Sequence, residues 1–153
     1  MKTGYLVDTN VLVYAYDSTD AAKRAKAIDT LEELGSSRLG ALSPQVLGEF
    51  FLVVTRKIPS PLTVPQARRS LTNYLHSWQV YDLNGWTVLE AIQAVQRYQL
   101  AYWDALIWAT AKLNQLPIVL TEDFSDGLLI EGVRFINPFE DSFDPESIAE
   151  LRR

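Results

Sequence analysis

The chain has 153 residues, of which 48% are hydrophobic, and this is enough apolar material for the core of one compact domain. It contains no cysteine and a single histidine, which excludes a disulfide framework, a thiolate nucleophile and the multi-histidine sites that zinc usually occupies. With 14 lysines and arginines against 19 aspartates and glutamates, the formal net charge is −5, which argues against a large basic surface for nucleic acid.

The apolar runs of the sequence are short. None reaches the length of about 18 uncharged residues that a membrane span needs. Asp8 places a charge directly behind the first apolar run. Neither a membrane span nor a signal peptide is therefore expected, and the protein is predicted to be cytoplasmic.

The first half of the chain alternates between short apolar runs and longer amphipathic segments. Ser43 followed by Pro44 is a strong helix start, because a capping side chain precedes proline at the first helical position. Thr63 and Gln66 have the spacing of a capping box. In chain order, this half is expected to contain a strand at 5–8, a helix from 11, a helix at 21–35, a strand at 39–42, a helix at 44–55 and a helix at 64–78.

The second half continues the same alternation, with Asn84 as the candidate cap of its first helix. The expected elements are a strand at 80–83, helices at 85–98 and 102–113, a strand at 117–121, a turn at 122–127 and a strand at 133–136. This pattern predicts right-handed crossovers and a mostly parallel sheet covered on both faces, which is a three-layer α/β/α sandwich. The residues after Pro138 are polar and predict a loosely attached tail.

Three acidic residues, Asp8, Glu49 and Asp104, stand alone in apolar segments. They are the only charged residues of segments 5–16, 41–55 and 100–111, respectively. An isolated buried carboxylate loses several kcal/mol of hydration unless something compensates it, and no lysine or arginine lies within one helical turn of these acids. Asp8 and Asp123 each follow a predicted strand, and ligand crevices form at the carboxyl ends of parallel strands. The sequence therefore predicts that the acids converge around something positive.

Each acid also has a purely structural explanation. Asp8 is placed to cap a helix, Asp104 to favour a helix dipole, Asp123 to form a turn and Glu49 to lie at an exposed helix edge. If all four structural explanations held, the acids would have come to these positions by four independent coincidences. A cluster of the four acids is therefore the preferred interpretation. Carboxylates without histidine or cysteine suit Mg²⁺ or Mn²⁺, and these ions serve phosphate chemistry.

Four short motifs, taken in their order, resemble a PIN domain. They are Leu6-Val-Asp8-Thr-Asn10, Ser43-Pro-Gln-Val-Leu-Gly-Glu49, Tyr102-Trp-Asp104 and Leu120-Thr121-Glu-Asp123. The resemblance extends over residues 5–139. The group of similar proteins includes the toxin halves of VapBC toxin–antitoxin pairs. The PIN-like nuclease domain is accordingly expected at residues 1–139, with the polar tail at 140–153.

The resemblance implies cleavage of RNA that depends on Mg²⁺ or Mn²⁺, frequent homodimers and, for a toxin, a cognate antitoxin. The site residues that it implies are the catalytic and metal-binding acids Asp8, Glu49, Asp104 and Asp123, supported by Asn10 and Thr121. Asp8 and Asp104 are the acids expected to contact the metal directly. Whether Glu122 or Asp126 adds a ligand stays open.

Two other functions fit parts of the pattern. A Mg²⁺-dependent phospho-acceptor domain needs its acids mainly on strand ends and a lysine after a late strand, whereas Glu49 and Asp104 fall on predicted helices and no lysine follows Lys112. A catalytically inactive PIN-like module would act only by binding a partner protein. The presence of all four acids favours the nuclease.

The surface that contacts RNA is left undefined. Its basic candidates are Lys23, Arg24, Lys26, Arg56, Lys57, Arg68 and Arg69, for which a solvated helix face is the competing explanation. Aromatic residues at helical spacing usually belong to a core or an interface. None of the four tryptophans is therefore assigned to the substrate.

Overall fold

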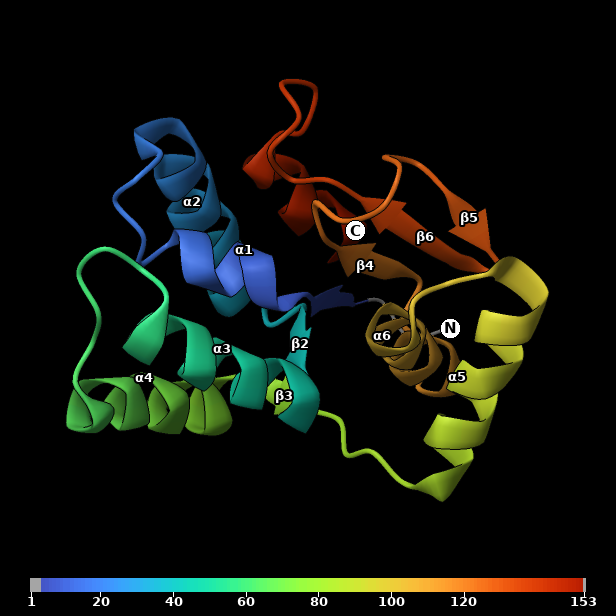
Figure 1. The fold of residues 1–153 in the computed structure, drawn as a ribbon. Helices are drawn as coiled ribbons and strands as arrows, with labels where there is room; N and C mark the ends of the chain where they lie inside the picture. Colours follow the sequence, from blue (N-terminus) through green and yellow to red (C-terminus); the bar gives the residue numbers. More distant parts are fainter. Residues whose placement is uncertain (1–3, 153) are drawn as a thin grey trace.

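The computed structural model describes residues 4–152, in which two helices follow each of the first three strands and the last three strands follow one another (Figure 1). The elements are β1 (Tyr5–Val7), α1 (Thr9–Tyr14), α2 (Ala21–Ser37), β2 (Gly40–Leu42), α3 (Pro44–Arg56), α4 (Val64–Ser77), β3 (Gln79–Val80), α5 (Gly85–Tyr98), α6 (Tyr102–Leu113), β4 (Ile118–Leu120), β5 (Leu129–Ile130), β6 (Val133–Ile136) and the 3-10 helix η1 (Pro145–Arg152). The expected helix starts are confirmed, since Ser43, Thr63 and Asn84 each cap a helix through the side chain.

The strands form one sheet of six in the order β3-β2-β1-β4-β6-β5. All neighbours are parallel except β5 and β6. Figure 1 shows α1 and α2 on one side of the sheet and α5 and α6 on the other. The predicted α/β sandwich with a mostly parallel sheet is confirmed.

The location of the site follows from the central place of β1 in the sheet. Tyr5 of β1 lies opposite Gly40 of β2 on one side and Ile118 of β4 on the other. The chain therefore leaves the sheet at the carboxyl ends of β1, β2 and β4 side by side, which is where open α/β sheets form their ligand crevices.

The strand β5 was not expected from the sequence. It pairs with β6 through a two-residue turn in which Glu131 and Gly132 both have positive φ, 46° and 87°. Such a turn matches the right-handed twist of a hairpin and accepts glycine at no steric cost. The indole nitrogen of buried Trp108 donates to the Ile130 carbonyl at 3.1 Å and so ties β5 to α6.

The segment after Pro138 differs from its expectation of a loosely attached tail. Residues 145–152 form η1, which packs against α2, and Ile148 is fully buried. Ile148 and the partly buried Phe139 and Phe143 dock an otherwise polar segment, because their burial removes apolar surface from water. The boundary between residues 139 and 140 stays a prediction.

The core lies between the sheet and both helical layers. Its largest fully buried side chains include Leu6, Phe50, Trp108, Leu120 and Phe135. Within residues 4–152, no helix combines the length and the apolar character that a bilayer span requires.

Candidate active site

Asp8 stands where β1 passes into α1, and it is the most enclosed of the acids, with 3% of its surface exposed. One carboxylate oxygen accepts from the Thr9 amide at 2.7 Å and the other from the Thr121 hydroxyl at 2.7 Å. Burial raises the pKa of Asp8 to about 7; the nearby Asp123 and Asp104 carboxylates also raise it, whereas the two hydrogen bonds lower it. The fold therefore holds a carboxylate where its ionisation is costly.

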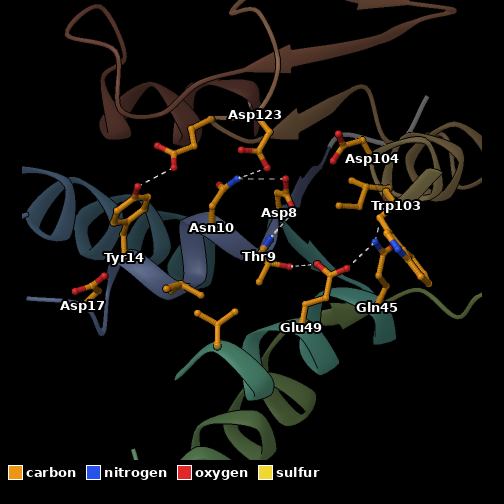
Figure 2. A pocket seen from close by; sticks show the side chains of 14 residues that line it. Asp8, Thr9, Asn10, Tyr14, Asp17, Gln45, Glu49, Trp103, Asp104 and Asp123 are labelled. Atoms are coloured by element: carbon orange, nitrogen blue, oxygen red, sulfur yellow. Dashed lines mark hydrogen bonds between the residues drawn. The ribbon is translucent and has the colours of Figure 1, made fainter. Parts of the chain in front are cut away.

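Asn10 connects the ends of β1 and β4 (Figure 2). Its amide nitrogen donates to Asp123 at 3.1 Å and approaches Asp8 at 3.4 Å. The Thr121 hydroxyl, which donates to Asp8, accepts from the backbone amide of Asp123 at 3.0 Å. The structure thus places Asn10 and Thr121 in contact with two of the predicted acids.

Glu49 reaches the same place from α3, which begins at the cap residue Ser43. One of its oxygens accepts from the Thr9 hydroxyl at 2.8 Å and the other from the Gln45 amide at 3.1 Å. The same Gln45 nitrogen donates to the Trp103 carbonyl at 3.0 Å. Gln45 therefore links the carboxylate on α3 to the first turn of α6.

Asp104 lies in that first turn, where the helix dipole favours a negative charge. Its pKa is raised, mainly by burial and then by the Asp123 and Glu49 carboxylates. Since Asp8 is affected by Asp104 and Asp123 in the same way, the four predicted acids influence one another through space.

These acids surround a pocket of about 320 Å³ at the carboxyl ends of the strands (Figure 2). Its lining residues are Asp8, Thr9, Asn10, Val13, Tyr14, Asp17, Gln45, Glu49, Val53, Trp103, Asp104, Ile107, Glu122 and Asp123. None of the described residues that line it is a lysine or an arginine. Across residues 4–152, none of the four predicted acids forms an ion pair. Within the described residues, these four acids therefore have only neutral hydrogen-bond donors as partners.

The oxygen atoms that line the pocket are of the kinds that bind a hard cation. Two buried side-chain oxygens of the described chain, Asn10 Oδ1 and Gln45 Oε1, have no hydrogen-bond partner, and both residues line the pocket. Carboxylate, amide and hydroxyl oxygens are the ligands that Mg²⁺ and Mn²⁺ prefer. Within residues 4–152, however, no three acidic or histidine side chains already have the geometry of a metal site. Like charges repel one another when no cation lies between them.

Two further acids left open by the sequence, Glu122 and Asp126, have other partners. Glu122 lines the pocket, yet its carboxylate accepts from the Tyr14 hydroxyl at 2.7 Å and pairs with Lys23 at 2.8 Å. Asp126 accepts from the backbone amide of Asn137 at 2.8 Å and does not line the pocket. Both side chains are therefore engaged in holding local structure.

Sequence reasoning missed Thr9 and Gln45, whose side chains bond to Glu49. Gln45 is four residues before Glu49, a spacing at which helical side chains meet, so this signal was present. Thr9 carries no comparable signal, because its contact with Glu49 joins two separate helices.

Comparisons with known proteins cover most of the chain. A family model described as PIN domain matches residues 5–125. A toxin–antitoxin complex from Klebsiella pneumoniae is similar at 23% identity with a TM-score of 0.64, covering 90% of this chain and 99% of its own. VapBC2 from Rickettsia felis, bound to a DNA fragment from its promoter, is similar at 18% identity with a TM-score of 0.60, covering 88% and 97%.

A third similar structure is VapC20 from Mycobacterium tuberculosis, a toxin that cleaves the sarcin–ricin loop. It is 16% identical with a TM-score of 0.58, covering 76% of this chain and 87% of its own. At such identities the likeness concerns the fold. No curated protein matches the chain.

Proposed function

This chain belongs to the PIN domain family, and from that premise we propose that it is a Mg²⁺- or Mn²⁺-dependent endoribonuclease, the toxin of a toxin–antitoxin pair. The observation that carries the proposal is the pocket itself. Four acids that no described cation neutralises surround it, and both unpartnered buried oxygens belong to residues that line it. Buried charge without a counter-charge destabilises a fold, so such a site is expected to bind a ligand.

In this proposal Asp8, Glu49, Asp104 and Asp123 hold the cation. When bound, a divalent ion activates water and neutralises charge on a phosphate. The chain itself contributes orientation, because neutral donors hold the carboxylates of Asp8, Glu49 and Asp123 without neutralising their charge. Thr9 holds both Asp8 and Glu49 through its backbone amide and its hydroxyl.

The proposal includes protein partners and a cytoplasmic location. Two of the similar structures are toxin–antitoxin complexes, and this supports an antitoxin partner. Helix α5 exposes Trp86, Leu89 and Ile92, which supports a further protein contact such as a homodimer.

Cleavage of a mixed RNA pool tests the proposed activity. We expect purified protein to produce fragments with Mg²⁺ or Mn²⁺ and to stop when EDTA is added. Cleavage that survives exhaustive chelation would contradict the metal requirement. Absence of cleavage with either ion would favour the alternative of an inactive protein-binding module.

Thermal melting gives a readout that does not depend on activity. A cation that binds only the folded protein stabilises it by about 2.7 kcal/mol at a hundredfold excess over its dissociation constant. We expect Mn²⁺ to raise the melting temperature of wild type and to leave the Asp8→Asn, Asp104→Asn double variant unchanged. An equal rise in both proteins would place the bound ion elsewhere.

A further inference from the structure

The environments of the four tryptophans differ sharply. Trp108 is buried in the core, and Trp78 packs edge to face against Tyr74. Trp86 and Trp103 are 75% and 62% exposed. Of these two, Trp103 lines the acidic pocket, whereas Trp86 on α5 does not. An indole at the rim of a polar pocket contributes little to the core, so its position calls for another explanation.

From this position we infer that Trp103 is a stacking platform for a nucleobase of the RNA substrate. The inference rests on the proposed function and adds a substrate contact to the same site. Trp103 and Asp104 both line the pocket from the first turn of α6, so a base on the indole lies at the rim of the acidic pocket. Figure 2 shows Trp103 beside Asp104 and Gln45.

Two contacts hold Trp103 in a defined place. Its carbonyl accepts from the Gln45 amide, which also binds Glu49. Its ring meets the Tyr102 ring edge to face, with centroids 5.0 Å apart and planes at 70°. Because Tyr102 packs against the core and is not parallel to the indole, it anchors Trp103 without covering it as a stacked ring would. A platform fixed in this way adds little ordering cost on binding.

The charge of the pocket explains why such a platform is needed. RNA is a polyanion, and none of the described lining residues is a lysine or an arginine. Lys23 lies close by, but Glu122 already pairs with it. A base stacked on an aromatic ring gains affinity that does not depend on phosphate charge and does not require a particular base. Such a contact also favours an unpaired base, whose face is free to stack.

Binding of a fluorescein-labelled, mixed-sequence single-stranded RNA oligonucleotide tests the inference. It is measured by anisotropy with Mg²⁺ in an Asp8→Asn background, so that the RNA stays intact. We expect Trp103→Ala to weaken binding roughly 5- to 150-fold, the range for loss of one stacked base, and Trp103→Phe to retain most of the affinity. Leu75→Ala on α4 is the control, since it removes a side chain that is 57% exposed and does not line the pocket, and its binding should change less than about twofold.

A set of abasic oligonucleotides locates the contact. Each has the sequence of the same RNA and lacks the base at one position. With Trp103 present, removal of one particular base should weaken binding, and in Trp103→Ala the same removal should cost nothing further. Equal affinity of the Trp103→Ala and Leu75→Ala proteins would overturn the inference, as would an RNA that does not bind at all. A Trp103→Ala protein with unchanged RNA binding and an altered oligomeric state would instead make Trp103 a protein contact. If the stacking signature is present but wild type cleaves no RNA, the proposed function fails while the platform stands.

Discussion

Helix α6 contributes to two groups of acids that differ in whether a lysine or arginine neutralises them. At its first turn, Asp104 joins acids that receive only neutral donors. At its last turn, Lys112 contacts both Glu90 and Glu131, and Arg97 adds a second cation to Glu131. Burial raises the pKa of Asp104, whereas the Tyr98 hydroxyl and Lys112 lower the pKa of Glu131 despite partial burial.

This comparison separates acids with a structural role from acids whose counter-charge the described residues do not supply. Around Lys112 the chain provides its own counter-charge, so the cluster is complete without a ligand. Around Asp104 the counter-charge must come from outside, and the unpaired state costs free energy.

Removal of a single charge from the pocket should have the largest effect. We expect Asp8→Asn and Asp104→Asn to reduce RNA cleavage by about a thousandfold or more, because each removes a ligand for the activating ion. Both variants should fold, and without metal they should melt at or above the wild-type temperature, since one repulsive charge is gone. Glu131→Gln is the control and should cleave RNA normally. Unfolding of both asparagine variants would make the pocket acids structural as well.

The pH dependence of stability should distinguish the two groups next. Asp8 has a folded-state pKa of about 7 against a reference of 3.8, so between these values the native protein binds a proton that the unfolded chain has released. The free energy of unfolding should therefore fall as pH rises through this window and level off above it, by up to about 4 kcal/mol for this residue.

Urea unfolding in EDTA between pH 4 and 8 measures this effect. Asp8→Asn removes the titrating group, so its difference from wild type should grow with pH across the window. A difference that is constant with pH would show that Asp8 is not held in a desolvated state.

A smaller effect is expected from a neutral donor. Gln45→Met keeps the size of the side chain but loses both donations, to Glu49 and to the Trp103 carbonyl. Loss of such a supporting contact typically costs about 10- to 100-fold in metal affinity or activity. Steady-state cleavage rates of Gln45→Met, with Gln93→Met on the exposed face of α5 as control, test this. Equal rates in the two variants would remove Gln45 from the site.

The smallest change should come from the completed cluster. Lys112→Met loses two ion pairs that are partly open to solvent, and such pairs contribute at most about 1 kcal/mol each. We expect a modest fall in melting temperature that shrinks at high salt, with cleavage unaffected. A large loss of activity in this variant would erase the distinction between the two groups.

Local signals explain what the sequence predicted well. Ser43, Thr63 and Asn84 announce helix starts because a capping side chain acts on its own next residues. The isolated acids were visible because a lone charge in an apolar segment is conspicuous without any knowledge of neighbours. Asp8 and Glu49 do lie in one pocket as expected, although their catalytic role stays a prediction.

What could not be predicted depends on contacts between distant segments. The burial of Ile148 exists only because α2 is there to receive it, and the strand β5 only because β6 pairs with it. The exposure of Trp103 is of the same kind. Its flanking sequence reads as a buried helix, and only the packed structure shows that its own position faces the pocket.

The pairing of β1 with β4 determines when the pocket can exist during synthesis. Tyr5 is in register with Ile118, and Asp8 meets Thr121 across that pair of strands. A growing chain that ends before Asp123 therefore has the first three acids but cannot assemble the set. Contacts between residues so far apart in sequence also slow folding. The pocket of the proposed active site can therefore be complete only after synthesis has passed Asp123.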